Sequence, residues 1–547
     1  MFSRLLRLYH TVKPLRFEQV FYRIYYRLRG PIKLSQVFDI VCGREWKWSA
    51  IEVAPTSYLT QNQVIFLNKK VDISHPTIWN DNTEEKLWLY NLHYFDDLNA
   101  IDSITRKSIQ HELVTRWISE NPPAEGNGWE PYPLSLRLVN WIKWYNRSGI
   151  DDQAILDSIA QQAEALSKQL EYHILGNHLF ANAKALVFVG CFLEGELGVK
   201  YLKLGFKLLD REIPEQFLGD GGHFELSPMY HCILLWDLLD LINLANIALE
   251  PLLKNRLESW KNTATKAFDW LNVMTHPDGE VVFFNDSTIG IAASPSQLKR
   301  YAATLNLDTC RKLNHYELLS YSGYTRIGFS DYSLIFDHGE VGPSYLPGHA
   351  HADTLSFEMS LGESRFFVNS GTSLYGLSEE RHRQRGTAAH NTVVVDSEDS
   401  SEVWGGFRVA RRAHSIVNDV FVGDDLVTIT ASHDGYTRLT PGVNHKRNIL
   451  ANNDEVVITD SIDQVGVIAK AYFHVHPDIK ITIISDDSLE LQSDEGQCII
   501  VKTSTPLELE HSTYHPGFGV SVANQKICVY LENEGLEVSL KFKRNTL

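Results

Sequence analysis

Tyr332-Ser333-Leu334-Ile335-Phe336 carries an aromatic or aliphatic residue at every second position, as do Leu355-Ser356-Phe357-Glu358-Met359 and Leu536–Phe542. A period of two predicts β-strands, because successive side chains of a strand point to opposite faces of the sheet. Such stretches occur beyond about residue 318, whereas the preceding chain has a helical period. This change, near residues 312–315, decides the predicted fold.

Between about residues 85 and 310 the apolar residues recur at helical spacing, with Gly, Pro and Asn breaks. The clearest segments are Ile109–Ile118, Leu134–Tyr145, Ile155–Leu170, Leu179–Leu193, Cys232–Leu249 and Leu253–Met274. Several helices of similar length predict stacked hairpins in an α/α barrel or solenoid, although no strict sequence repeat is present.

The period-two segments predict an antiparallel β-sandwich or large sheet, with Gly362 in a hairpin turn. We therefore predict three parts: a basic helical arm and lead-in (1–84), a helical domain (85–315) and an antiparallel β domain (316–547). A groove is expected where the last two meet.

The formal net charge of the 547 residues is −17, which makes nucleic acid an unlikely class of partner and requires a local basic surface for any acidic polymer. The six cysteines show no CxxC spacing, so free thiols are expected. No run of 18 uncharged apolar residues predicts a membrane span. Arg4 and Arg7 interrupt what would be a signal-peptide core, so we expect a cytoplasmic or inner-membrane-associated protein.

Residues 1–34 contain eight basic residues and one acidic residue, with apolar residues interleaved at helical spacing. One interpretation is a pair of basic amphipathic helices that contacts an anionic membrane surface or polymer. The other is a helical arm packed on the protein with its basic side solvated.

His349, His351 and Asp353 alternate, so in a strand they would share one face. Such a pair of histidines can hold a metal or place a base beside a ligand, and can also be a hydrogen-bonded pair. His390 precedes an expected strand and could complete a metal site with His351. Asn369 would be the third ligand, although an uncharged amide is a weak one for zinc.

Asn177 and His178 open a helix, where Asn is either an N-cap or an amide donor for a substrate carboxylate. Tyr230, beside His231, is either packing or a general acid. Asp220 and Glu225 offer the carboxylate pair that a glycoside hydrolase needs, or Glu225 orients a neighbouring group.

Two arginine clusters and several aromatic residues are candidates for binding a sugar polymer. The arginines suit carboxylate or sulfate groups, and the aromatics suit stacking on sugar rings. These candidates are Arg381, Arg383, Arg385, Arg408, Arg411, Arg412, Trp129, Tyr132, Trp141, Trp144 and Trp404.

An ordered set of short blocks resembles the heparinase II/III-like polysaccharide lyase family over about residues 85 to 415. The blocks are Asn91–Phe95, Gly128–Pro133 with Arg137, Gly176–His178, Asp220–Glu225, Ser227–His231, His276–Gly279 with Asn285-Asp286, Gly348–Asp353, Asn369–Gly371 and His390-Asn391. The resemblance implies an α/α toroid followed by an antiparallel β-sandwich, and β-elimination in a uronic-acid polysaccharide.

The resemblance also implies roles for individual residues. Asn177, with His178, would neutralise the uronate carboxylate, while Tyr230 and His349 would serve as acid and base. A zinc or calcium ion would be held by His351, Asn369 and His390, although Asn369 stands where the family pattern has an acidic residue. Supporting or substrate-binding roles are predicted for His178, Glu225, His231, Arg137, Arg385, Trp129 and Trp404.

Four hypotheses about function follow. The first is a polysaccharide lyase, and the second is a uronate C5-epimerase on the same scaffold in polysaccharide biosynthesis. The third is a hydrolase that uses Asp220 and Glu225. The fourth is a non-catalytic polysaccharide-binding protein.

Overall fold

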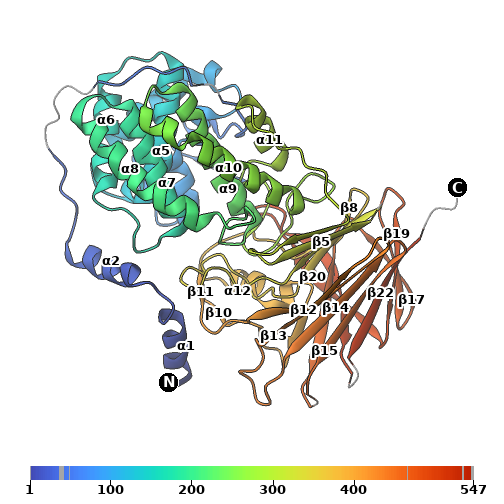
Figure 1. The fold of residues 1–547 in the computed structure, drawn as a ribbon. Helices are drawn as coiled ribbons and strands as arrows, with labels where there is room; N and C mark the ends of the chain where they lie inside the picture. The colour runs from blue at the N-terminus through green and yellow to red at the C-terminus, as the bar shows by residue number, and fades with distance from the viewer. Residues whose placement is uncertain are drawn as a thin grey trace.

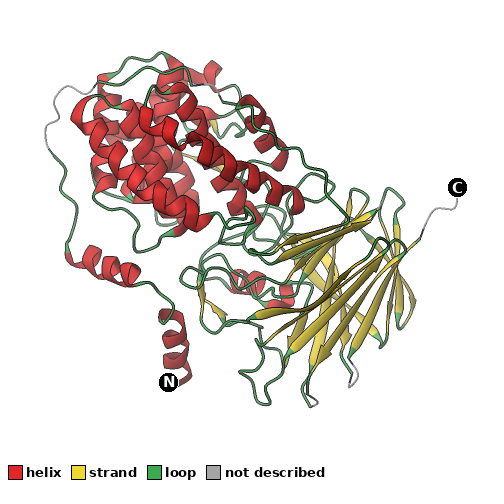
Figure 2. Ribbon diagram, viewed as in Figure 1, coloured by secondary structure: helices red, strands yellow, loops and turns green. Residues whose placement is uncertain are grey.

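The chain folds into an α/α toroid followed by an antiparallel β-sandwich, and the predicted fold class is confirmed. The computed structural model describes residues 2–35, 42–48, 50–329, 331–464, 466–532 and 535–543. Helices gather in the first part of the chain and strands in the second, as Figure 1 and Figure 2 show.

The toroid is built from helices of 9 to 23 residues. Its α-helices are α3 (Lys86–Tyr94), α4 (Lys107–Glu120), α5 (Pro131–Ser148), α6 (Gln153–Ser167), α7 (Gly176–Phe192), α8 (Gly195–Gln216), α9 (Pro228–Ile247), α10 (Pro251–Val273) and α11 (Pro295–Thr304). Short 3-10 turns join them: η1 (Pro76–Asn80), η2 (Asp96–Asn99), η3 (Ser103–Arg106) and η4 (Asn127–Trp129). Helices α7 and α9 bury almost every residue, as inner helices do, whereas α8 and α10 each expose one side.

One sheet of the sandwich has eight strands. In spatial order they are β12 (Ser415–Val422), β13 (Leu426–His433), β14 (His445–Asn452), β15 (Glu455–Ile462), β22 (Leu536–Phe542), β19 (Cys498–Thr503), β18 (Ser488–Gln492) and β17 (Lys480–Ser485). Every neighbouring pair in this sheet is antiparallel. Alternating burial along β13 to β15 places one face of the sheet on the sandwich core.

The second sheet has nine strands and lies nearer the toroid (Figure 1). Its order is β20 (Leu507–Tyr514), β21 (Val522–Tyr530), β16 (Ala469–Val475), β8 (Ser364–Phe367), β7 (Phe357–Leu361), β6 (Tyr332–Asp337), β5 (Tyr324–Phe329) and β4 (Tyr316–Leu319), with β9 (Val393–Val395) paired to β16. Gly362 has φ +59° in the β7–β8 turn, so the predicted hairpin is confirmed. Insertions on this side contain α12 (Glu379–Arg385), η5 (Thr387–Ala389), β10 (Val403–Trp404) and β11 (Arg408–Val409).

The segment His349 to Asp353 is a loop, which corrects the predicted strand. Its backbone groups bond to other loops instead of to a neighbouring strand. The carbonyl of His349 accepts from the Asp286 amide at 3.0 Å, and the amide of Ala352 donates to the Arg385 carbonyl at 2.9 Å. The loop is thereby fixed at the junction of the two domains.

A small apolar cluster joins the toroid to the sandwich. Trp270 of α10 and Met274, which follows this helix, pack with Tyr324 of β5 and Ile335 of β6. The Trp270 indole donates to Ser322 Oγ at 2.9 Å. The loops that enter α7 and α9 and the loop that precedes β7 lie beside this junction. The site residues come from these loops.

The first 72 residues contain α1 (Phe2–Val12), α2 (Phe17–Leu28) and a sheet of β1 (Tyr58–Thr60), β2 (Gln63–Phe66) and β3 (Lys69–Asp72) that the sequence patterns did not predict. All six cysteines are free, as expected. Among the described residues no helix is both long and apolar enough to cross a bilayer.

Candidate active site

The three predicted catalytic residues lie at the starts of two inner helices and in the loop before β7. Asn177 is in the first turn of α7, and Tyr230 is in the first turn of α9. The Ser227 hydroxyl caps α9 by accepting from the Tyr230 amide at 3.2 Å, and donates to the Asp286 carbonyl at 2.6 Å. The same contacts that begin α9 therefore tie it to the loop that carries Asp286.

Backbone strain is concentrated next to these residues. Leu175, Leu226 and Asn285 have φ of +72°, +58° and +56°, and each lies one or two residues from Asn177, Glu225 or Asp286. Non-glycine residues seldom adopt such angles, and the strain clusters at functional sites in proteins generally. The arrangement is held by the surrounding contacts at some expense in local stability.

Asp286 is the hub of the site. Its carboxylate accepts from His349 Nδ1 and His351 Nε2, both at 2.8 Å, and from both terminal nitrogens of Arg381. Burial alone would raise the pKa of Asp286, but Arg381 and the two imidazoles hold this pKa well below its usual value. An ionised Asp286 makes His349 Nδ1 the donor, so in the neutral form of the ring the lone pair is on Nε2.

Tyr230 lies against His349. Their rings stack with centroids 3.9 Å apart, and the Tyr230 hydroxyl is 3.1 Å from that of Tyr375. Burial raises the pKa of Tyr230 well above its usual value, and Tyr375 raises it further. Tyr230 is therefore a neutral phenol that can donate a proton at neutral pH.

Glu225 links Asn177 to His349. Its Oε1 accepts from the backbone N–H of Asn177 at 3.1 Å and from the side-chain Nδ2 of Asn177 at 3.0 Å. Its Oε2 lies 3.6 Å from His349 Nε2. Glu225 Oε2 is buried and has no hydrogen-bond partner. The side-chain Nδ2 of Asn177 carries a second N–H that does not bond to Glu225, and this N–H can donate to a ligand.

His178 lies beside Asn177 and is half-buried against Glu171. Its Nδ1 lies 2.9 Å from Glu171 Oε1, and its ring centroid lies 4.4 Å from that of Tyr132. Burial would lower the pKa of His178, but the Glu171 carboxylate outweighs it and raises this pKa. A positive charge next to Asn177 would attract a uronate carboxylate.

Four residues with a predicted supporting or substrate-binding role have buried side chains whose polar groups are used within the protein, which favours the supporting role. Arg137 and Arg385 donate to backbone carbonyls, His231 bonds to the Ala267 carbonyl, and Trp129 donates to the Asn121 carbonyl. None of the four has a surface for a sugar. Trp404 is half-buried, with Arg408 over its ring and its indole N–H donating to Thr11 at 3.1 Å.

The carboxylate pair of the hydrolase hypothesis is not available. Asp220 Oδ2 accepts from the amides of Tyr321 and Ser322 and from the Ser322 hydroxyl, and its Oδ1 accepts from the Gly222 amide. This carboxylate closes a turn against β4, so Glu225 is left without the predicted partner.

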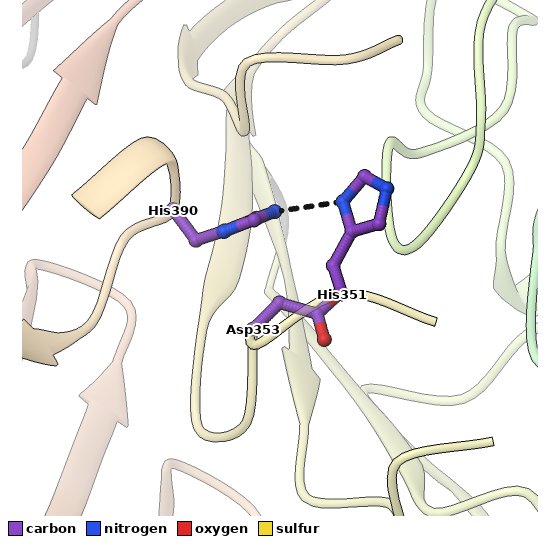
Figure 3. Close-up of side chains that lie close together, drawn as sticks. All are labelled: His351, Asp353 and His390. Atoms are coloured by element: carbon purple, nitrogen blue, oxygen red, sulfur yellow. Dashed lines mark hydrogen bonds between the residues drawn. The ribbon is translucent and has the colours of Figure 1, made fainter. Parts of the chain in front are cut away.

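A possible metal centre adjoins Asp286. Ligand atoms of His351, Asp353 and His390 lie within 4.8 Å of one another, and all three residues are buried (Figure 3). His351 Nδ1 faces His390 Nε2 at 3.1 Å, while the opposite nitrogens contact Asp286 Oδ1 and the Gly386 carbonyl at 2.8 and 2.9 Å. Because both of these outer partners accept, both outer nitrogens carry protons, and two lone pairs would face each other unless a cation lies between them.

A second buried histidine pair shows the contrast. His445 Nδ1 lies 3.2 Å from His433 Nε2. The Asp460 carboxylate accepts from His445 Nε2 at 2.8 Å and from Nε and Nη2 of the Arg447 guanidinium. Here, however, His433 Nδ1 accepts from the Gly435 amide, so its Nε2 carries the proton and both rings are satisfied as neutral imidazoles. Only the His351–His390 pair of these two needs an added positive charge.

That charge fits a metal better than a proton. Burial lowers the pKa of His351, although Asp286 opposes this, which disfavours a doubly protonated ring. Asp353 offers a carboxylate to this group of candidate ligands, whereas the sequence prediction had only the uncharged amide of Asn369. Asn369 Oδ1 accepts from the backbone amide of Asn391, and its Nδ2 has no hydrogen-bond partner, so Asp353 is a better candidate than Asn369 for the third ligand. Two imidazoles and a carboxylate suit zinc better than calcium.

Sequence reasoning missed three contributors. Asp286 stood in a quoted block without a role, and Tyr375 was not singled out. Arg381 was interpreted as a ligand for sulfate or carboxylate groups, yet it pairs with Asp286 and is fully buried. The order of blocks along the chain was the only available signal for Asp286.

An α/α toroid and a β-sandwich that join an Asn, a Tyr and a His at their junction define a polysaccharide lyase scaffold. The chain belongs to the heparinase II/III family: its N-terminal domain description matches residues 58–308, and the description "Heparinase II/III-like, C-terminal" matches residues 311–542.

Similar proteins carry two kinds of names. FtsZ-localized protein C of Caulobacter vibrioides is 27% identical, over 72% of this chain and 70% of that protein. A heparin-sulfate lyase of Pedobacter heparinus is 25% identical over 59% of this chain, and the match spans 49% of that enzyme's length. A crystal structure of heparinase III superposes with a TM-score of 0.70 at 18% identity, over 84% of this chain and 78% of that one, which supports the fold.

Proposed function

We propose that this protein is a lyase that cleaves a uronic-acid-containing polysaccharide by β-elimination and leaves 4,5-unsaturated uronate ends. The observation that carries the proposal is the stack of Tyr230 on His349, with the His349 ring oriented by Asp286. It places a neutral acid beside an imidazole whose second nitrogen, Nε2, can act as a base.

The reaction begins with the uronate carboxylate, whose charge makes the C5 proton weakly acidic. The free N–H of Asn177 and the His178 cation offset this charge as it spreads into the enolate-like state. His349 Nε2 then takes the C5 proton, and the imidazolium that forms lies between Asp286 and Glu225.

The C4–O4 bond breaks as the C4–C5 double bond forms, and Tyr230 gives its proton to the leaving O4. Tyr375, at 3.1 Å, offers a route for returning a proton to Tyr230. For a uronate of the opposite C5 configuration, Tyr230 and His349 would exchange these roles. A divalent metal held by His351, Asp353 and His390 would supply fixed positive charge next to the Asp286 hub.

A uronate C5-epimerase would use the same abstraction of the C5 proton and return a proton to the opposite face. A non-catalytic role also has a relative to support it, because one similar protein is named for localisation with FtsZ. The complete set of Asn177, Tyr230 and His349 favours catalysis over binding alone.

Mass spectrometry of uronate polymers after incubation with the protein tests the proposal. A lyase divides the chain into fragments whose summed mass equals that of the substrate, one of them carrying the unsaturated end. A hydrolase adds one water at each cut, and an epimerase or a binding protein leaves the chain length unchanged. The proposal would be contradicted if every polymer of the panel either gained one water at each cut or kept its chain length. The panel is heparosan, heparin, chondroitin, hyaluronan, alginate and bacterial capsular polymers.

A further inference from the structure

Helices α1 and α2 expose their apolar faces, whereas an amphipathic helix normally packs that face on its protein. The exposed residues recur at i, i+3, i+4 and i+7 in each helix, so they form one stripe on each. They are Leu5, Leu8, Tyr9 and Val12 of α1, and Phe17, Val20, Phe21, Ile24, Tyr25 and Leu28 of α2. Phe17 is 83% exposed and Leu28 is 79% exposed.

The opposite side of α2 is the side that holds it on the toroid. Gln19 is buried and donates to the carbonyls of Tyr345 and Ile174 at 3.1 and 3.3 Å. Tyr22 stacks on Tyr172 with ring centroids 4.5 Å apart. Polar and aromatic contacts therefore pack the helix on the protein with its apolar stripe outward, so apolar as well as basic side chains of the arm face solvent.

Helix α1 is oriented in the same way. Thr11 lies off the apolar stripe, and its hydroxyl accepts from the Trp404 indole at 3.1 Å. Leu5, Leu8 and Val12 remain outside this contact and exposed. Figure 1 draws the two helices along one side of the molecule, outside the bundle of toroid helices.

The charge around the stripes is strongly basic. Residues 1–34 contain eight basic residues and one acidic residue, Glu18, and so have a net charge of +7. Since the whole chain has a net charge of −17, the remaining residues have a net charge of −24. An anionic surface would attract these helices and repel the remaining body, which sets one orientation of approach. A second copy of the chain would bring two +7 segments together, and a soluble polyanion would leave the apolar stripes in water.

We infer that α1 and α2 dock the protein on a lipid bilayer that carries anionic headgroups. The apolar stripes insert at the boundary between headgroups and acyl chains. Arg16, Arg23 and Arg29 bond to the body of the protein, so the headgroup contacts fall to the other basic residues of the arm, Arg4, Arg7, Lys13, Arg27 and Lys33. Helix α2 rests on Ile174 and Tyr345, which precede Asn177 by three residues and His349 by four. Docking therefore holds the loops of the candidate site close to the membrane-facing helix.

Sedimentation of the full-length protein with vesicles tests this inference. We expect at least tenfold stronger partitioning onto phosphatidylcholine vesicles containing phosphatidylglycerol than onto phosphatidylcholine alone, with less binding at high salt. The combined changes Phe17→Ser, Phe21→Ser and Leu28→Ser should lower partitioning at least tenfold. Because these side chains are exposed, the thermal unfolding temperature should stay within a degree or two.

Two controls make the result specific. Leu249→Ser with Leu377→Ser removes two side chains that are 93% and 86% exposed but lie outside the arm, and this variant should bind like the wild type. Lys13→Glu with Arg27→Glu should lose anionic-vesicle binding by about thirtyfold or more, since each of the two lost charges contributes about 1 kcal/mol, or about fivefold, near such a surface. Equal binding by the wild type and the triple serine variant would overturn the inference. So would a wild-type dimer that ignores vesicles and becomes monomeric in that variant, as measured by light scattering.

Discussion

His349 Nδ1 lies 2.8 Å from Asp286 Oδ2, and this contact fixes which nitrogen of the ring is free to act as a base. The Asp286 carboxylate also accepts hydrogen bonds from Arg381 and His351, so it connects the proposed base to the candidate metal centre. The chemistry of the site and the stability of the domain junction thus depend on the same buried group.

Asp286→Asn should lower kcat by about three orders of magnitude or more, because His349 would no longer be held in the required tautomer. It should also destabilise the protein by about 3–5 kcal/mol by leaving Arg381 buried without its partner. Asp460→Asn is the matched control, since Asp460 also binds a buried histidine and arginine. It should show a similar loss of unfolding free energy and normal kcat per folded molecule, and equal kcat in the two variants would contradict the role of Asp286.

Tyr230→Phe should reduce kcat by about 10²–10⁴-fold while leaving the binding of oligosaccharide unchanged, because only the proton donor is removed. Tyr375→Phe should reduce kcat by about tenfold, since its hydroxyl touches Tyr230 and not the leaving group. Steady-state kinetics and calorimetric titration measure both effects. A Tyr230→Phe variant with full turnover would remove Tyr230 from the mechanism.

The KM for a uronate substrate should rise as the pH rises through the pKa of His178. Glu171 raises this pKa, so the ring is a cation at and below its usual pKa and loses its charge only above that range. The stability that this pair contributes is likewise complete at low pH and lost as the pH increases through the raised pKa. Glu171→Gln should move the midpoint of the KM profile to lower pH, and an unchanged profile would contradict the assignment.

Added zinc should raise the unfolding temperature of metal-free protein. At 100 times Kd the expected stabilisation is about 2.7 kcal/mol for one site. His390→Ala should abolish the shift, whereas His433→Ala should retain it, because the His433–His445 pair is satisfied without a cation. A shift that persists in His390→Ala would place the metal elsewhere.

Gly176→Ala should destabilise the protein and lower kcat together. Gly176 has φ +58°, and a Cβ there would lie 2.3 Å from Leu346 Cδ2 and 2.7 Å from Glu225 Oε1. Gly149→Ala is the matched control: its φ is +69°, yet nothing lies within 4 Å of an added Cβ. Gly149→Ala should therefore lose only about 1 kcal/mol with normal kcat, and a similar kcat in both variants would contradict the packing of Gly176 on Glu225.

Periodicity predicted most of the fold because the toroid and the sandwich bury their residues in regular patterns. The helices from α4 to α7 and α9 to α10 and the β7–β8 hairpin follow this rule. The loop from His349 to Asp353 does not, since its alternation has no neighbouring strand to pair with and its backbone bonds to residues 285–286 and 385 instead. Local pattern carries no information about such distant partners.

The candidate site was predicted in part for the same reason. The ordered blocks pointed to Asn177, Tyr230 and His349. The choice of Asp353 over Asn369 as third candidate metal ligand depends on which of these two side chains points toward His351 and His390, and sequence does not give this direction. The residue types of Arg137, Arg385 and His231 suggest ligand binding, but only the structure shows that these three side chains are buried. The outward apolar stripe of α2 also required the structure, because sequence gives the stripe but not the side that packs.

The most direct test of the proposed mechanism is the ultraviolet absorbance of 4,5-unsaturated uronate while the protein is mixed with each polymer of the panel. We predict a rise with at least one polymer for the wild type, and no rise for His349→Ala with its unfolding temperature preserved. A rise of the same rate in His349→Ala would contradict the assignment of the base, and a flat trace for the wild type on every polymer would contradict the lyase itself.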